Sequence, residues 1–189
     1  QQTSGGFTLT DTQNNVESYD SAGKLLSITS REGQVTSLTY DGQQRLATVT
    51  FPFGHAYTLS YDILNRLTSV TDPGGRIVGY GYDAKNRLAT VNNGDSTSHS
   101  YVYEDAGFPY ALTGLIDESS TRLSTWGYDM KGRAVSTEEA GVTNKVTFVY
   151  NADGSVTSTD ALGAVRTFTF NRYGDRRAVT GISGTQCPT

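Results

Sequence analysis

An aromatic residue followed by an acidic residue or asparagine recurs along this chain at a nearly constant interval, and this repeat limits the fold more than any other feature. We call these aromatic residues the anchors; successive anchors lie 21, 21, 21, 21, 25, 22 and 20 residues apart. A period of this length is typical of architectures built from one repeated supersecondary unit. We therefore predict a single repeat array over residues 1–189. The eight anchors are Tyr19, Tyr40, Tyr61, Tyr82, Tyr103, Tyr128, Tyr150 and Phe170.

The segment after each anchor has the composition of a tight turn. Glycine and asparagine, which tolerate positive φ, fill the fourth position in seven of the eight repeats. The acidic residue or asparagine directly after the anchor can accept backbone N–H bonds across such a turn. We predict a hairpin turn closed by a left-handed residue, with mild strain at Gln44. The fourth positions are Gly23, Gln44, Asn65, Asn86, Gly107, Gly132, Gly154 and Gly174.

Both flanks of these turns have the pattern of strands. Large apolar residues precede the anchors by two positions, as at Leu38 and Leu59, and therefore share a face with them. After the turn, pairs such as Leu46 and Val49 are three positions apart, which indicates either a bulge or a sheet buried on both faces. Glycine-rich turns also mark the opposite end of each repeat. We predict an all-β fold, a long curved antiparallel sheet of about 16 strands with almost no helix.

Charge and hydropathy argue against nucleic acid as a partner and against a membrane span. The net charge of −4 and the pI of about 5.1 provide no general attraction to nucleic acid. No segment approaches 18 consecutive apolar residues, so we expect no membrane span. The basic cluster of Arg172, Arg176 and Arg177 is interpreted as a solvated face.

Residues with chemical potential do not form a recognisable catalytic, cofactor or metal site. His55 and His99, the only histidines, lie in different repeats, and Cys187 has no recognisable base beside it. The carboxylates after the anchors are better explained as turn caps than as acids or bases, because they hold one fixed position. We therefore expect a protein that is not an enzyme and binds no cofactor. These carboxylates are Asp20, Asp41, Asp62, Asp83 and Asp129.

The repeats resemble the YD repeats of bacterial Rhs proteins. The resemblance rests on segments such as Tyr40-Asp41-Gly42-Gln43-Gln44-Arg45-Leu46 and on the longer repeat that begins Tyr103-Glu104-Asp105-Ala106-Gly107-Phe108-Pro109 and runs on to Trp126-Gly127-Tyr128-Asp129. It covers roughly residues 7–182. The resemblance extends to the related toxin-complex shells and teneurins.

This resemblance implies a fold and a role. In the family, YD repeats wind into a hollow cocoon around a variable C-terminal toxin domain, which type VI secretion or a toxin-complex injector delivers into target cells. We thus expect a shell segment from a secreted or cell-surface bacterial protein, whose partners are the rest of its own shell and an enclosed toxin. The chain lacks the family's self-cleavage region, and Asp72-Pro73-Gly74-Gly75, which resembles that motif, is interpreted as an ordinary turn. We expect a longer parent chain.

Two further expectations concern surfaces. The first is an alternative function, a carbohydrate-binding or adhesive module, because aromatic faces suit pyranose rings. Its candidate platform is Tyr80, Tyr101 and Trp126, although regular spacing of the aromatic residues favours cross-strand packing. The second is self-association through open sheet edges, since unpaired edges bind other strands.

Overall fold

The computed structural model describes residues 2–3 and 5–185. Its described residues fall into two compact units, one of residues 2–3, 5–81 and 91–97 and the other of residues 82–90 and 98–185. The described residues form 18 strands and two short 3-10 segments, with no α-helix among them. Strands β9 (Ile77–Tyr82) and β10 (Leu88–Asn92) contribute residues to both units.

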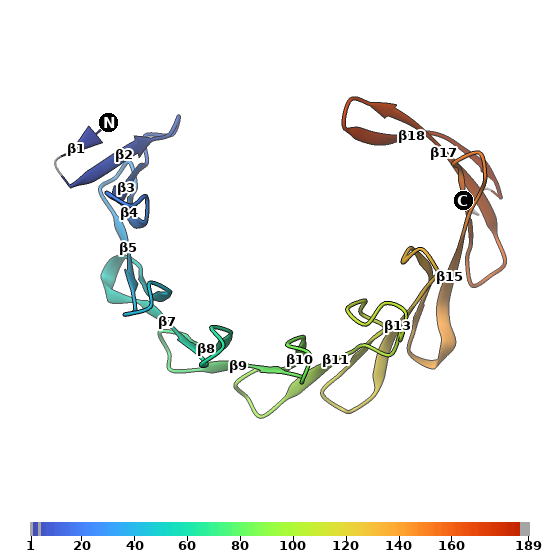
Figure 1. The fold of residues 1–189 in the computed structure, drawn as a ribbon, viewed down its shortest axis with the longest axis horizontal. Helices are drawn as coiled ribbons and strands as arrows, with labels where there is room; N and C mark the ends of the chain where they lie inside the picture. Colours follow the sequence, from blue (N-terminus) through green and yellow to red (C-terminus); the bar gives the residue numbers. More distant parts are fainter. Residues whose placement is uncertain (1, 4, 186–189) are drawn as a thin grey trace. The chain divides into compact units, whose positions relative to one another are not determined.

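In the first unit, each strand from β1 to β9 pairs with the next strand along the chain, always antiparallel (Figure 1). This is the simplest connection for short strands joined by tight turns. The elements of this unit, besides β9, are β1 (Gln2–Thr3), β2 (Gly6–Thr10), β3 (Val16–Asp20), β4 (Leu25–Thr29), β5 (Val35–Tyr40), β6 (Leu46–Thr50), η1 (Pro52–Gly54), β7 (Ala56–Tyr61) and β8 (Leu67–Thr71).

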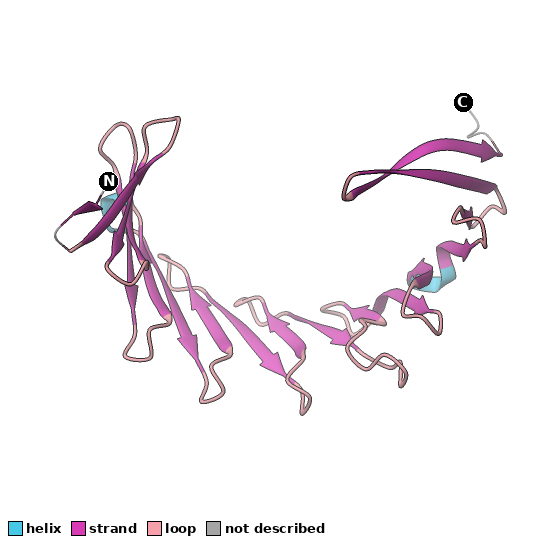
Figure 2. Cartoon of the chain, turned by 45° about the horizontal axis from the view of Figure 1, so that its top comes forward, coloured by secondary structure: helices cyan, strands magenta, loops and turns pink. Residues whose placement is uncertain are grey.

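The second unit repeats this topology from β11 to β18, again with only antiparallel pairs. Its helical segment, like that of the first unit, is confined to one turn (Figure 2). The elements are β11 (Ser98–Val102), β12 (Gly114–Ile116), β13 (Arg122–Tyr128), β14 (Ala134–Glu139), η2 (Ala140–Val142), β15 (Thr143–Tyr150), β16 (Val156–Thr159), β17 (Val165–Tyr173) and β18 (Arg176–Gly184).

The predicted all-β antiparallel fold is confirmed. Eight repeats of two strands account for β3 to β18, and the two additional strands, β1 and β2, precede the strand of the first anchor. The question of a bulge is also answered. Tyr40 pairs with Leu46 while Leu38 pairs with Val49, and the register shifts directly beside the anchor. The extra residue places Leu46 and Val49 on the same face of the sheet.

Burial in this fold is shallow. Among the described residues, Val91 is the only apolar one in the buried class, at 8% exposure, and none is below 2%. A single layer of sheet has no second layer to cover its apolar face, so its side chains remain half-buried. Stability must therefore depend strongly on bonds between neighbouring strands and repeats.

The turns at the end of each repeat opposite the anchor turn, which we call the far turns, are also closed by polar caps in most repeats. At residues 72–76, Asp72 Oδ1 accepts hydrogen bonds from Gly74 N and Arg76 N, both at 2.9 Å, and Gly75 has a φ of 85°. The segment Asp72-Pro73-Gly74-Gly75 is thus a far turn, as the sequence indicates.

Candidate functional site

The most regular arrangement of side chains in this molecule begins with the acidic cap of the anchor turn. Asp41 Oδ1 accepts hydrogen bonds from the backbone N–H groups of Gln43 and Arg45 at 2.9 and 3.0 Å. Its other oxygen, Oδ2, accepts from Arg45 Nε at 2.7 Å. One carboxylate therefore closes the turn and orients the guanidinium that follows it. The same carboxylate–arginine pair recurs at Asp62–Arg66, Asp83–Arg87 and Asp129–Arg133, with oxygen–nitrogen distances of 2.6 to 2.7 Å.

These contacts lower the pKa of the capping carboxyls. For Asp41 and Asp62 the largest cause is a hydrogen bond from the backbone N–H of the arginine four residues later. For Asp83 and Asp129 the side chain of that arginine has the largest effect on the pKa. Each carboxylate is thus held ionised by groups that it also bonds, which suits a structural cap better than a proton donor.

The residue four positions after the anchor has a positive φ, between 59° and 87°, in seven of the eight repeats. The expectation is wrong at Gly107, which is not among the residues with positive φ. Here Asp105 Oδ1 bonds the N–H groups of Gly107 and Phe108 at 2.8 and 3.0 Å, so the cap starts later than in other repeats. The carboxylate directly after the anchor, Glu104, is engaged elsewhere.

The last hairpin also departs from the expected turn. Strand β17 continues past Phe170 to Tyr173, and Asn171 pairs with Ala178 within the ladder rather than capping a turn. The chain reverses at Gly174 and Asp175, between the end of β17 and the start of β18. Arg177, in the returning strand, then places its guanidinium 4.6 Å from the centre of the Phe170 ring.

Each anchor tyrosine with a described hydroxyl contact to the preceding repeat donates to a backbone carbonyl there. Tyr61 Oη donates to the Leu46 carbonyl at 2.9 Å, and Tyr40 Oη donates to that of Leu25 at 2.7 Å. Since each of these two acceptors lies in the strand that follows the anchor turn of the preceding repeat, this bond joins two successive hairpins. Equivalent bonds run from Tyr103 to Leu88, Tyr128 to Leu112 and Tyr150 to Ala134, at 2.6 to 2.9 Å.

A cation from the preceding repeat covers the ring of the same anchor. Arg45 lies 4.5 Å from the centre of the Tyr61 ring, and its Nη1 also donates to Asn65 Oδ1 at 2.9 Å. Such cation–π contacts add to the hydroxyl bond. Lys24 over Tyr40, Arg87 over Tyr103 and Arg133 over Tyr150 repeat the arrangement at 4.0 to 4.4 Å. We call the hydroxyl bond and the cation together the inter-repeat lock.

The cation of this lock was missed by the sequence analysis, although a signal for it is present. The fifth position after the anchor holds a basic residue in five of the eight repeats, namely Lys24, Arg45, Arg66, Arg87 and Arg133. Its role depends on consecutive hairpins lying side by side. This arrangement brings a cation and a ring that are 16 or 17 positions apart in the sequence into contact.

The 25-residue repeat has a different set of contacts, centred on Arg122. Its guanidinium donates to both carboxylate oxygens of Glu104, at 2.8 and 3.2 Å, and to the Thr113 carbonyl at 2.8 Å. The pKa of Glu104 is lowered, chiefly by the hydrogen bonds from Arg122. The buried Thr113 hydroxyl accepts from Glu104 N at 2.9 Å and donates to the Val102 carbonyl at 3.0 Å. Gly114 leaves the space for the guanidinium, because a Cβ there would lie 2.4 Å from Arg122 Nη2.

Comparison with known proteins identifies the regular repeats. The RHS Repeat family model matches residues 19–56, 43–77 and 61–98, which hold the regular repeats anchored at Tyr19, Tyr40, Tyr61 and Tyr82. Residues 19–98 are a run of Rhs repeats. A search of curated proteins found no match.

Solved structures share the fold of the array. One is the crystal structure of TcdB2–TccC3 without its hypervariable C-terminal region, with a TM-score of 0.61 and 14% identity over 88% of this chain. Another is the Photorhabdus luminescens Tc holotoxin pore with a mutation in TccC3, with a TM-score of 0.54 and 12% identity over 90% of this chain. The chain spans only about a tenth of the length of each of these proteins, 10% and 12% respectively.

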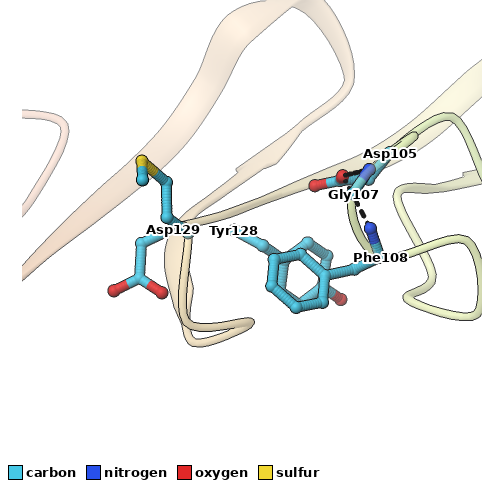
Figure 3. A pocket seen from close by; sticks show the side chains of 6 residues that line it. Asp105, Gly107, Phe108, Tyr128 and Asp129 are labelled. Atoms are coloured by element: carbon cyan, nitrogen blue, oxygen red, sulfur yellow. Dashed lines mark hydrogen bonds between the residues drawn. The ribbon is translucent and has the colours of Figure 1, made fainter.

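An open pocket of about 410 Å³ lies in the 25-residue repeat. Phe108 and Tyr128 line it together with Asp105, Asp129 and Met130 (Figure 3). Phe108 occupies the fifth position after its anchor, where regular repeats carry the cation, so a phenyl ring replaces the charged group of the lock. Asp105 turns back to bond its own loop, as the dashed lines in Figure 3 show. Asp129 caps its own turn and pairs with Arg133 at 2.6 Å.

The residues proposed as a sugar platform do not fall in one unit. Tyr80 belongs to the first unit, whereas Tyr101 and Trp126 belong to the second. Tyr101 pairs with Leu115, which pairs with Ser124 two residues before Trp126, so these two aromatic side chains share a face of the sheet. All three are half-buried, and the Tyr101 hydroxyl lies 3.2 Å from His99 Nε2.

Other residues singled out from the sequence lie apart from any shared centre. Within the described part of the chain, no group of three or more His, Cys, Asp or Glu residues could hold a metal ion. Exposed His55 lies in the first unit and His99 in the second, while Cys187 lies outside the described residues. In the basic cluster, Arg172 is largely exposed and Arg177 bonds the Gly154 carbonyl at 2.5 Å.

No helix among the described residues has both the length and the apolar character needed to cross a bilayer.

Proposed function

We propose that this chain forms part of the wall of an Rhs-type shell that encloses a toxin domain carried C-terminal to the repeats. The inter-repeat lock carries this proposal. Each lock joins a hairpin to the one before it through a hydroxyl bond and a covered ring, as at Tyr61, Leu46 and Arg45. Repetition of such locks makes a thin wall that can be extended by adding repeats.

The electrostatics of the repeats support a structural role rather than catalysis. The carboxylates considered as acids or bases, such as Asp41 and Asp129, are ionised, cap their own turns and pair with arginine. A general acid or base needs a pKa near the working pH, whereas these pKa values are shifted downward. We infer that the repeats act by enclosing a toxin domain and by joining neighbouring hairpins into a wall.

The partners and location follow as part of the same proposal. The fold is shared with chains of the TcdB2–TccC3 structure and of a Tc holotoxin pore. We propose that the parent protein is bacterial and acts at the cell surface or after secretion, through type VI secretion or a toxin-complex injector. Its partners are the remaining repeats of its shell and the enclosed toxin.

Protease protection of the complete protein tests this function. A domain that follows the repeats should resist digestion while the wall is intact. Combined Tyr40→Ala and Tyr61→Ala substitutions, which remove two locks, should make that domain accessible to protease. Substitution of exposed Thr58, on the same strand as Tyr61, by Ala is the matched control and should leave protection unchanged. Equal digestion of the domain in all three proteins would refute an enclosing wall.

The carbohydrate-binding alternative has one supporting observation, the shared face of Tyr101 and Trp126. Calorimetric titration with neutral oligosaccharides tests it. Saturable binding by the wild type that Trp126→Ala abolishes would support a glycan site. Titrations without heat of binding would leave the shell as the only proposed role.

A further inference from the structure

The far turn at residues 51–55 exposes an aromatic side chain in a strained conformation. Phe53 has a φ of 69° and a ψ of 16°, in the left-handed region that glycine and asparagine prefer. Its side chain is 90% exposed, so packing within the chain does not compensate for this conformation. Phe51, which opens the turn, makes no side-chain cap, unlike Asp72 in the next far turn.

A far turn in the second unit has glycine at the corresponding third position. Gly141, in the far turn at residues 139–143, has a φ of 73° and a ψ of 19°, nearly the same as Phe53. The chain thus reaches nearly the same φ and ψ with glycine in another far turn. The phenyl ring of Phe53 adds strain and exposed apolar surface, and a bulky residue at such a position indicates a role outside local folding.

The second unit contains an apolar pocket that suits such a ring. Its volume is about 390 Å³, and Phe148, Tyr150, Phe168 and Phe170 provide most of its lining together with Ala134 and Val156. Arg177 is the only charged residue in the lining, and its guanidinium already stacks on Phe170 and bonds the Gly154 carbonyl. With that charge engaged, the pocket favours a neutral aromatic guest over an anion.

We propose that Phe53 of one copy of this chain inserts into the aromatic pocket of a second copy. The protruding ring and the pocket are different surfaces, so the contact is heterologous and each copy retains one free ring and one free pocket. Pro52 fixes the backbone beside the ring, which reduces the entropy lost on docking. A contact built on one aromatic anchor gives weak, open-ended association that grows with concentration.

Sedimentation velocity over a wide concentration range tests the proposal. Phe53→Gly removes the ring and uses the residue that this backbone prefers, and Ala134→Phe fills the pocket without deleting any of its lining. Each variant should weaken association by more than about tenfold, because both remove an anchor contact. Leu162→Ala is the control, since Leu162 is a 93% exposed apolar residue at the third position of another far turn and should not affect association.

Mixing the two variants gives the decisive result. Phe53→Gly retains the pocket and Ala134→Phe retains the ring, so an equimolar mixture should form 1:1 dimers that cannot extend. A wild-type chain that stays monomeric at every concentration would overturn the proposal. So would undiminished association of either variant alone, or a monomeric mixture under conditions in which the wild type associates.

Discussion

A regular repeat of the first unit and the 25-residue repeat of the second unit hold their hairpins together by different means. In the regular repeat, Asp41 and Arg45 are four residues apart and form one pair at the turn. In the longer repeat, Glu104 and Arg122 are 18 residues apart and bind across a loop, with buried Thr113 between them. The local pair can be copied from repeat to repeat, whereas the long-range cluster allows a longer loop.

The two kinds of repeat also differ in the space around the glycine of the anchor turn, and therefore in which side chains that turn can accept. Near Gly23, in the first unit, the nearest atom that an added Cβ would meet is a Phe7 ring carbon at 3.9 Å. At Gly132, an added Cβ would lie 3.0 Å from a ring carbon of Phe108, which replaces the cation in the longer repeat. The longer repeat thus packs against the following turn, while the turn at Gly23 remains open.

The largest expected effect comes from valine at these two glycines. Gly132→Val should lower the free energy of unfolding by about 2–3 kcal/mol, because a β-branched residue at positive φ is strained and also displaces Phe108. Gly23→Val should cost about 1–2 kcal/mol from backbone strain alone. Urea unfolding measures both. In a Phe108→Ala background, Gly132→Val should cost no more than Gly23→Val. Equal costs of the two valine substitutions in the wild-type background would show that Phe108 does not pack against the turn at Gly132.

Substitution of Thr113 tests the cluster of the longer repeat. Thr113→Val keeps the shape of the side chain but removes the hydroxyl that bonds Glu104 N and the Val102 carbonyl. We expect a loss of about 2 kcal/mol in the free energy of unfolding, since a buried donor loses its partner. Thr113→Ser retains the hydroxyl and should cost less. A valine variant as stable as the wild type would show that the loop does not depend on this network.

The hydroxyl bond of the anchor is common to both kinds of repeat and should contribute the same free energy of unfolding in each. Tyr61 Oη bonds the Leu46 carbonyl at 2.9 Å, and Tyr128 Oη bonds that of Leu112 at 2.6 Å. Phenylalanine at either position should reduce the free energy of unfolding by about 1 kcal/mol, the usual net value of such a bond. A cost at only one position, measured by denaturant unfolding, would mean that the hydroxyl bond does not contribute equally to the two kinds of repeat.

Much of this fold is readable from the sequence because its rules are local. The 21-residue period, the acidic cap and the glycine or asparagine four positions after the anchor together predict successive hairpins. The bulge beside Tyr40 could not be decided, because spacing alone does not show which face Leu46 and Val49 occupy. Only the register resolves it.

The candidate site was harder to predict from the sequence, because it consists of contacts between side chains that are far apart in the sequence. The role of Arg45 depends on the ring of Tyr61, 16 residues away, and that of Arg122 on Glu104, 18 residues away. The prediction for Gly107 failed for the same reason. Once Glu104 binds Arg122, it no longer caps its own turn, and no neighbouring residue signals that exchange.

Acid should weaken the capping pairs in a predictable direction. The pKa of Asp41 is lowered in the folded chain, so its contribution to stability is present above the ordinary value of 3.8 and is lost as the pH falls through the folded pKa. Asp41→Asn should therefore be less stable than the wild type at pH 7, and the difference should shrink below about pH 4. Unfolding curves from pH 7 to 2 measure it. A difference independent of pH would exclude an electrostatic cap.

The smallest expected effect is at Gln44, where two contributions oppose each other. Gln44 has a φ of 66°, so glycine would relieve strain that a side chain imposes there. The structure adds a cost, because Gln44 Oε1 accepts a hydrogen bond from Lys24 Nζ of the preceding repeat. Gln44→Gly should therefore change the free energy of unfolding by no more than about 0.5 kcal/mol, since the strain relieved offsets the exposed bond lost. In a Lys24→Ala background only the relief of strain remains, and the same substitution should become stabilising. If it were equally neutral in both backgrounds, measured by paired denaturant curves, Gln44 would contribute nothing to the junction between the repeats.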